Sequence, residues 1–217
     1  MATTELGTTS ATAVREVTVT GMPSVADPGP LGLAAFALTT FLLSAKNAGW
    51  SHGVAAWLPF ALAYGGVGQL LAGMWEFRNR NIFGATAFST YGAFWIGFAL
   101  YVELVVPADK PTAAQLSNDF GWALMAFLIF NTYMLLWSTM VNNAVTGVFL
   151  TLEVTELLLV IGYLSSSSSM IKAGGVVGVI TAAVAWYTSA AGVANNMAGR
   201  IVLPVGKPMS WATTHHI

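Results

Sequence analysis

The sequence predicts an all-α integral membrane protein, a bundle of six transmembrane helices, on the basis of composition and spacing. Hydrophobic residues make up 56% of the 217 residues and charged residues only 8%, whereas an ordinary soluble domain is about 25% charged. Apolar runs close to the length of about 20 residues that crosses a bilayer recur along the chain. We predict spans at about 30–45, 54–75, 85–106, 120–139, 146–164 and 173–193.

The remaining composition excludes several classes of function. The net charge of −1 favours neither nucleic acid nor anionic lipid as a specific partner. Cysteine is absent, so disulfides, thiolate catalysis and cysteine-based metal sites are excluded. The sequence shows no nucleophile–base pair beside a glycine elbow, no phosphate loop and no Asp/His cluster. We therefore expect no enzymatic activity, no metal and no cofactor.

The first 22 residues are polar and rich in threonine, without the apolar core of a signal peptide. We predict three regions: a disordered cytoplasmic arm over 1–26, a six-span membrane domain over 27–206, and a cytoplasmic tail over 207–217.

The first span follows the segment DPGPLGL at residues 27–33. Its two prolines lack backbone donors and have a fixed φ, so they suit the first turn of a helix. A helix N-terminus carries about half a positive charge and unpaired N–H groups, which can bind a carboxylate. Pro30, Leu31 and Gly32 are therefore candidate substrate-binding residues.

The later spans follow from their boundaries and small residues. Glycines at 65, 66 and 68 in the second span allow close helix packing, and Arg78 and Arg80 mark the water before the third. A polar loop over 107–118 precedes the fourth span, and Asn142 and Asn143 form the turn before the fifth. Five serines at 165–169 precede the sixth, in which Gly174 and Gly178 have helix-packing spacing.

Basic residues predict the orientation, because positive loops stay on the cytoplasmic side. With both termini in the cytoplasm, five basic residues fall inside and three outside. The inner set is Arg15, Arg78, Arg80, Arg200 and Lys207; the outer set is Lys46, Lys110 and Lys172.

Separated motifs together resemble the acetate uptake transporter family, which includes the bacterial succinate-acetate permeases. The resemblance covers about 27–206. The motifs are DPGPLGL at 27–33 with the threonines at 39 and 40, YGG at 64–66 with Gln69, the block from Phe83 to Trp95, and GRIVLP at 199–204. One departure is Asp27, where the family usually has asparagine. An ionised Asp27 would repel an anionic substrate at the entrance.

The resemblance implies a homohexamer in which each protomer has its own pore, an arrangement shared with proton-gated urea channels. It also implies a pore narrowed by Phe36, Tyr91 and, by gapless extension along the fifth span, Leu152. Such a ring would act as a dry gate, because an ion enters a narrow apolar constriction at high cost. The Tyr91 hydroxyl would be the one donor there for a carboxylate. From the residues alone, each of the three would be interpreted as an ordinary packing residue.

Thr40 and Gln69 lie nearest to these motifs and are candidate substrate contacts. Hydrogen bonding between helices is the alternative role for them, as it is for Asn131.

Glu153 and Glu156 lie three residues apart near the middle of the fifth span, and the resemblance does not account for them. An ionised carboxylate at that depth costs about 3 kcal/mol on insertion scales. Either residue could couple transport to protons; alternatively, each is a protonated side chain bonded to a neighbouring helix or subunit.

We therefore expect a multi-pass protein of the inner, or plasma, membrane that is in contact with lipid and carries acetate and similarly small carboxylates, with succinate as a further candidate. Coupling to protons is the favoured hypothesis over a passive anion channel. A channel for a neutral solute such as urea or ammonia is the alternative, and a sensor or scaffold with a vestigial pore is a third.

Overall fold

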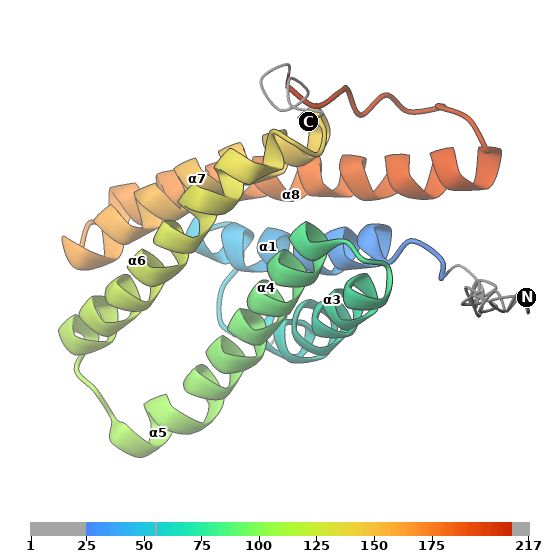
Figure 1. The fold of residues 1–217 in the computed structure, drawn as a ribbon. Coiled ribbons are helices and arrows are strands. Elements are labelled where there is room, and N and C mark those ends of the chain that lie inside the picture. The colour runs from blue at the N-terminus through green and yellow to red at the C-terminus, as the bar shows by residue number, and fades with distance from the viewer. Residues whose placement is uncertain (1–24, 55, 210–217) are drawn as a thin grey trace, which may run out of the picture.

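The computed structural model describes residues 25–54 and 56–209, and the regular secondary structure in these residues is helical (Figure 1). Within them, five helical segments are long and apolar enough to cross a membrane. They are α1 (Gly29–Asn47), the run of α4 (Ile82–Leu100), η2 (Tyr101–Val105) and α5 (Val106–Asp109), then α6 (Ala113–Ser138), α7 (Asn143–Leu164) and α8 (Ser168–Ala198).

The sixth crossing is a helical path in three consecutive parts: α2 (Leu58–Phe60), the π-helical η1 (Ala61–Gly68) and α3 (Gln69–Arg78). The starts of α1 and α4 lie at the same end of the bundle, since Gly29 and Gly84 both adjoin the Glu76 carboxylate. The chain must therefore return across the bundle between Asn47 and Ile82. Six crossings agree with the sequence prediction.

The second crossing differs from the single regular span predicted at 54–75. It begins at Leu58, and its middle is wound more widely than an α-helix. Gly65 faces Thr39 of α1 and Gly66 faces Ile96 of α4, and neither glycine leaves room for a Cβ atom. The wide turns thus coincide with close approach of two neighbouring helices, a local packing effect that apolar periodicity does not reveal.

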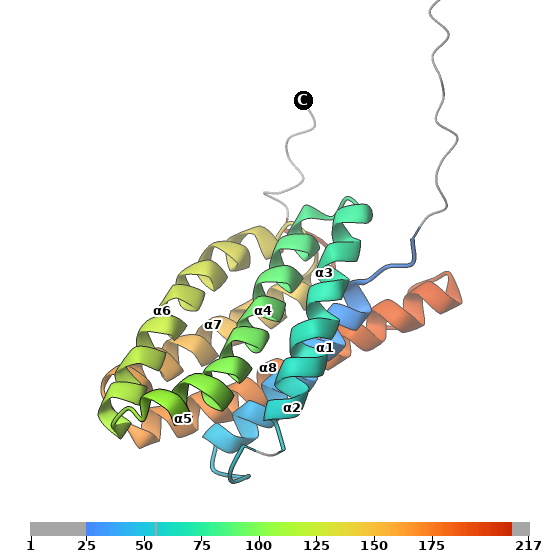
Figure 2. The same ribbon diagram turned by 90° about the horizontal axis from the view of Figure 1, so that it is seen from below.

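Helices α1, α4 and α7 run in one direction, and α3, α6 and α8 run back. Helix α1 is central: it packs against α8 on one side and against α3, η1 and α4 on the other (Figure 2). The outer faces carry exposed apolar side chains, for example Trp122, Ile129 and Leu136 on α6. Such faces are typical of helices that contact lipid, so the chain is a multi-pass membrane protein.

The two glycines predicted to mark a packing face contact different helices. Gly178 adjoins Ser44 of α1, whereas Gly174 faces Leu159 of α7. Gly175 packs directly against the α1 backbone at Asn47 and Ala48. The closest contact of α8 with α1 therefore uses the pair 175 and 178.

Several helices extend beyond the predicted apolar runs because polar residues cap them. Helix α6 begins at Ala113, inside the predicted loop, where Thr112 and Gln115 form a capping box. Helix α8 begins within the serine run, capped by Ser167, and ends before Gly199 at φ +60°. Apolar runs mark the membrane core, while caps decide where a helix begins.

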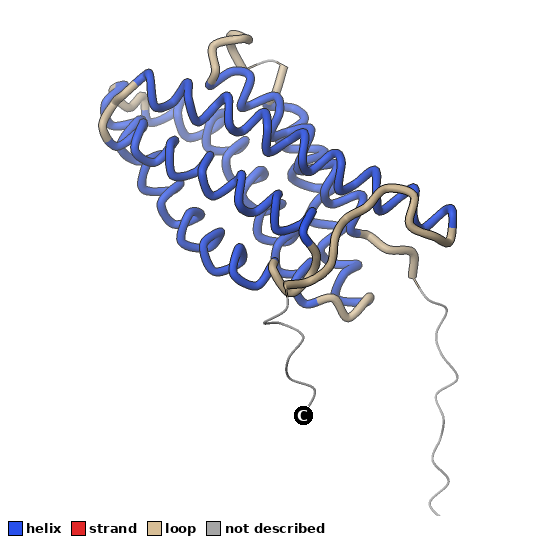
Figure 3. Tube along the Cα trace, turned by 90° about the horizontal axis from the view of Figure 1, so that it is seen from above, coloured by secondary structure: helices blue, strands red, loops and turns tan. Residues whose placement is uncertain are grey.

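The chain after α8 turns back across the end of the bundle (Figure 3). The Asn195 side-chain oxygen accepts hydrogen bonds from the Val202 and Leu203 amides at 2.7 and 2.9 Å. The Tyr187 hydroxyl donates to the Pro204 carbonyl at 2.7 Å, and the Met209 amide donates to the Thr139 carbonyl at 2.9 Å. The predicted tail is therefore hydrogen-bonded to the bundle at Met209; the residues after Met209 and nearly all of the predicted arm lie outside the described residues.

Candidate functional site

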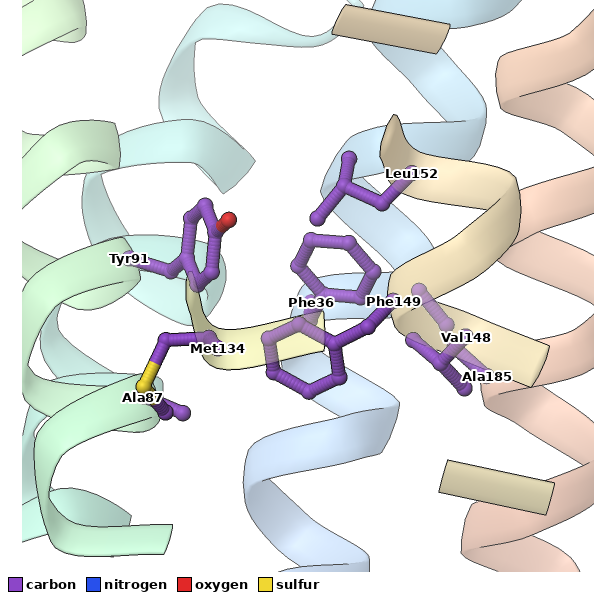
Figure 4. Packing of buried hydrophobic residues seen from close by; sticks show 9 residues of the cluster. Phe36, Ala87, Tyr91, Met134, Val148, Phe149, Leu152 and Ala185 are labelled. Atoms are coloured by element: carbon purple, nitrogen blue, oxygen red, sulfur yellow. The ribbon is translucent and has the colours of Figure 1, made fainter. Parts of the chain in front are cut away.

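The structure brings Phe36, Tyr91 and Leu152 together in one apolar cluster inside the bundle (Figure 4). They come from α1, α4 and α7, and each is 5 or 6% exposed. The Phe36 and Tyr91 ring centroids are 5.7 Å apart. Phe149 belongs to the same cluster and was missed from the sequence, although it lies one helical turn before Leu152 on the same face.

A cavity lies on each side of this cluster. The lower cavity, of about 230 Å³, is lined by the first turns of α1, α4 and α7 and by the last turns of α3 and α8. The upper cavity, of about 50 Å³, is lined by the later turns of α1, α4 and α7 and by the start of α6. We call the cluster between them, built around Phe36, Tyr91 and Leu152, the constriction.

The two cavities are about one helical turn apart. Along α4, Ala87 lines the lower cavity and Tyr91 the upper one. Along α7, Phe149 lines the lower cavity and Leu152 the upper one. The arrangement is two chambers in line, separated by an apolar plug within a single chain.

The lower cavity is polar toward its outer end. Its polar lining side chains are Asp27, Glu76, Asn81, Asn142, Thr188 and Asn195. Glu76 is only 1% exposed, and Asn79 donates a hydrogen bond to its Oε2 at 3.2 Å. Gly84 leaves no room for a Cβ beside the Glu76 carboxylate, which explains a glycine at the start of α4. Sequence reasoning missed the place of Glu76 in this cavity.

The predicted docking end of α1 opens on this cavity through Pro30. Its first amide is already engaged, because the Gly29 N–H donates to Asp27 Oδ1 at 2.9 Å. The carboxylate found at this helix end is thus the chain's own. Leu31 is 47% exposed and lines a separate hollow between α1 and α8, and Gly32 packs against the Phe88 ring. Of the three predicted binding residues here, only Pro30 borders the lower cavity.

Three residues that line the upper cavity have a buried polar atom that lacks a hydrogen-bond partner among the described residues: Thr40 Oγ1, Trp95 Nε1 and Glu156 Oε2. Buried polar groups are nearly always paired, so such atoms mark a place where a ligand can bond. Thr40 and Glu156 are 6% exposed, and Trp95 is 3% exposed. Gln69 also has an unpaired oxygen, but it does not line either cavity.

A hydrogen-bonded chain joins the constriction to the outer face of α6 and α7. The Tyr91 hydroxyl donates to Asn131 Oδ1 at 3.0 Å, and Asn131 Nδ2 donates to the Phe149 carbonyl at 3.0 Å and to Glu153 Oε2 at 2.6 Å. The Thr132 hydroxyl donates to Glu153 Oε1 at 2.7 Å. The two glutamates therefore differ. Glu156 borders the upper cavity, whereas both carboxylate oxygens of Glu153 accept hydrogen bonds, one from Asn131 and one from Thr132.

Comparison with known proteins places this fold in a family. A model described as the GPR1/FUN34/yaaH family matches residues 11–211. The chain is 41% identical over 204 residues to Acetate permease A of Emericella nidulans, covering 87% of this chain and 68% of that protein. It is 34% identical over 187 residues to the Succinate-acetate/proton symporter SatP of Escherichia coli K12, covering 86% of this chain and 98% of that protein.

A solved structure of the bacterial acetate channel SatP has a TM-score of 0.79 at 34% identity, covering 84% of this chain and 99% of that chain. The fold and the chambers define a multi-pass membrane protein of the transporter and channel class. The chain belongs to the GPR1/FUN34/yaaH family. The resemblance inferred from the sequence motifs is thereby confirmed.

Proposed function

We propose that the chain carries acetate and similarly small carboxylates along a path inside each protomer, with succinate as a second candidate. The path runs from the lower cavity through the constriction to the upper cavity. The observation that carries this proposal is the apolar plug between two chambers within one chain. The names of the relatives supply the class of substrate.

The assembly and its placement are part of the proposal. A homohexamer in the inner, or plasma, membrane follows from the family resemblance. Both termini are proposed to face the cytoplasm, because that orientation places more basic residues inside. The lower cavity would then open to the cytoplasm.

Proton coupling is assigned to Glu156. Its carboxyl group lines the upper cavity together with the Tyr91 side chain. A proton moves from the Glu156 carboxyl to the substrate carboxylate, leaving Glu156 as a carboxylate that is reprotonated from the upper side. Glu153, the other candidate from the sequence, is held by Asn131 and Thr132. If Glu153→Gln with Glu156→Gln leaves the pH dependence of uptake unchanged, the coupling proposal is wrong.

A channel for a neutral solute is the second candidate. It is favoured by the lining of the two cavities, where no Lys, Arg or His is found among the described residues. Labelled acetate uptake into proteoliposomes separates the candidates. Competition by succinate but not by urea or ammonium supports the carboxylate proposal. Competition by urea or ammonium supports the neutral-solute channel, and absence of any flux refutes both.

A further inference from the structure

The hydroxyl group that Tyr91 brings to the constriction already donates its proton in a hydrogen bond. Its hydroxyl oxygen lies on the side of the ring that faces Leu152 (Figure 4), and the hydroxyl donates to Asn131 Oδ1 at 3.0 Å. A phenol hydroxyl has one proton, so a second donation toward the path is not available.

The direction of that hydrogen bond is fixed by the surroundings of Asn131, which is fully buried. The backbone carbonyl of Phe149 only accepts hydrogen bonds, so the amide end that faces it at 3.0 Å is the NH₂ group. The second N–H of this group meets Glu153 Oε2 at 2.6 Å. The amide oxygen must then face Tyr91, and the tyrosine must donate to it.

Tyr91 therefore offers the path a lone pair, not a proton. A carboxylate has only acceptor oxygens and would meet another acceptor at the narrowest point. An undissociated carboxylic acid has one O–H, which can donate to the tyrosine oxygen. The sequence-based expectation that Tyr91 donates to the passing carboxylate is reversed by this network.

The charged groups along the path also favour the undissociated acid, independently of Tyr91. Among the described lining residues, the lower cavity has the carboxyl groups of Asp27 and Glu76, and the upper cavity has that of Glu156. No basic side chain lines either cavity in this part of the chain. Glu153 adds a further carboxyl group behind Asn131. An anion would cross a low-dielectric constriction flanked by acidic groups, without a compensating cation.

We infer that the constriction passes small carboxylic acids in their undissociated form, and that Asn131 is the positioning residue that sets this selection by engaging the proton of Tyr91. The inference rests on the proposed function and specifies the species that crosses. Under it, the transported proton travels on the substrate itself, so net charge does not cross the membrane. Glu153 supports the orientation of Asn131 and is not a carrier of the proton.

The test measures charge movement and acid movement separately in proteoliposomes. An acetate gradient at equal pH is imposed, and a voltage-sensitive dye reports any acetate diffusion potential. An entrapped pH dye reports acidification by entering acid. Because undissociated acetic acid also crosses bare lipid, the protein-dependent rate is the difference from matched protein-free vesicles in stopped flow. For the wild-type protein we expect protein-dependent acidification without a diffusion potential.

The decisive variant is Asn131→Leu, which removes the acceptor and frees the Tyr91 proton to turn toward the path. We expect it to gain an acetate diffusion potential that the wild type lacks, and we expect the added change Tyr91→Phe to abolish that gain. Glu153→Gln is the matched control: its amide oxygen still accepts from Asn131, so no potential should appear. If Asn131 had only a structural role, Asn131→Leu would lower acetate transport without creating a diffusion potential.

The outcomes separate the inference from the proposed function. A diffusion potential in the wild type overturns the inference while acetate transport stands, and this measurement decides even if Asn131→Leu does not fold. A folded Asn131→Leu variant without a potential also overturns the role of Asn131. Absence of both potential and protein-dependent acidification refutes the proposed function and the inference together.

Discussion

Removal of the Phe36 ring should open the constriction to larger acids. Phe36 is 5% exposed, and its ring lies against Tyr91 between the lower and upper cavities. We expect Phe36→Ala to join the two cavities, of about 230 and 50 Å³, into a lumen that water can enter. We expect transport of succinate to rise relative to acetate.

The magnitude follows from hydrogen bonds lost in the constriction. A polar group buried without a partner costs about 1–3 kcal/mol, and succinate carries one more carboxyl group than acetate. Restoring water to that group lowers the succinate barrier by about 1.4 kcal/mol, or roughly tenfold in rate. We therefore expect the ratio of succinate to acetate uptake to rise about tenfold.

The assay is uptake of labelled succinate and acetate into proteoliposomes, with assembly checked by size exclusion. Phe98→Ala is the matched control, since it removes the same ring from α4 and lines neither the upper nor the lower cavity. Phe36→Leu should keep the path narrow and preserve the wild-type ratio. An unchanged ratio in Phe36→Ala would remove this residue from the gate.

Three further changes test other parts of the account. Glu156→Gln should slow acetate uptake more at pH 7 than at pH 5, because the variant depends on acetic acid that is already protonated in bulk solution. Glu153→Gln should keep the wild-type pH profile of uptake. Equal effects of the two changes would contradict the assignment of proton coupling to Glu156. Asp27→Asn keeps an oxygen acceptor for the Gly29 amide and removes a negative charge from the lower cavity. The KM for acetate presented at that face should therefore fall about twofold, and added salt should screen this effect. An unchanged KM at low salt would show that Asp27 does not repel the substrate. Gly175→Ala places a Cβ atom against the α1 backbone and should lower the free energy of unfolding by about 2 kcal/mol, measured as a lower Tm in detergent. Gly97 has open space around it, so Gly97→Ala should not lower the Tm. Equal Tm values for the two variants would refute the close packing of α8 on α1.

Much of the architecture follows from the distribution of apolar residues. The six crossings were predictable because the bilayer demands long apolar helices. The grouping of Phe36, Tyr91 and Leu152 was predictable only through motif resemblance, since nothing in the local sequence distinguishes them from packing residues.

The remaining features depend on contacts between distant residues. Tyr91 and Asn131 are 40 positions apart, and no local pattern shows that their side chains meet. The place of Glu76 in the lower cavity likewise requires the packed bundle. Glu153 and Glu156 looked equivalent in the sequence, and only the partner of each carboxyl group separates them.

The central claim, that the path runs inside one chain through the constriction, is tested most directly by thiol accessibility. The chain has no cysteine, so Ala87→Cys in the lower cavity and Thr40→Cys in the upper cavity each carry the only thiol. We expect a charged thiol reagent to reach Ala87→Cys from the lower side only and Thr40→Cys from the upper side only. The reagent should block acetate uptake in both variants. The control variant Leu136→Cys, whose thiol faces outward, should retain uptake after treatment. Reaction of both path positions from the same side, or full uptake after both are labelled, would contradict the claim.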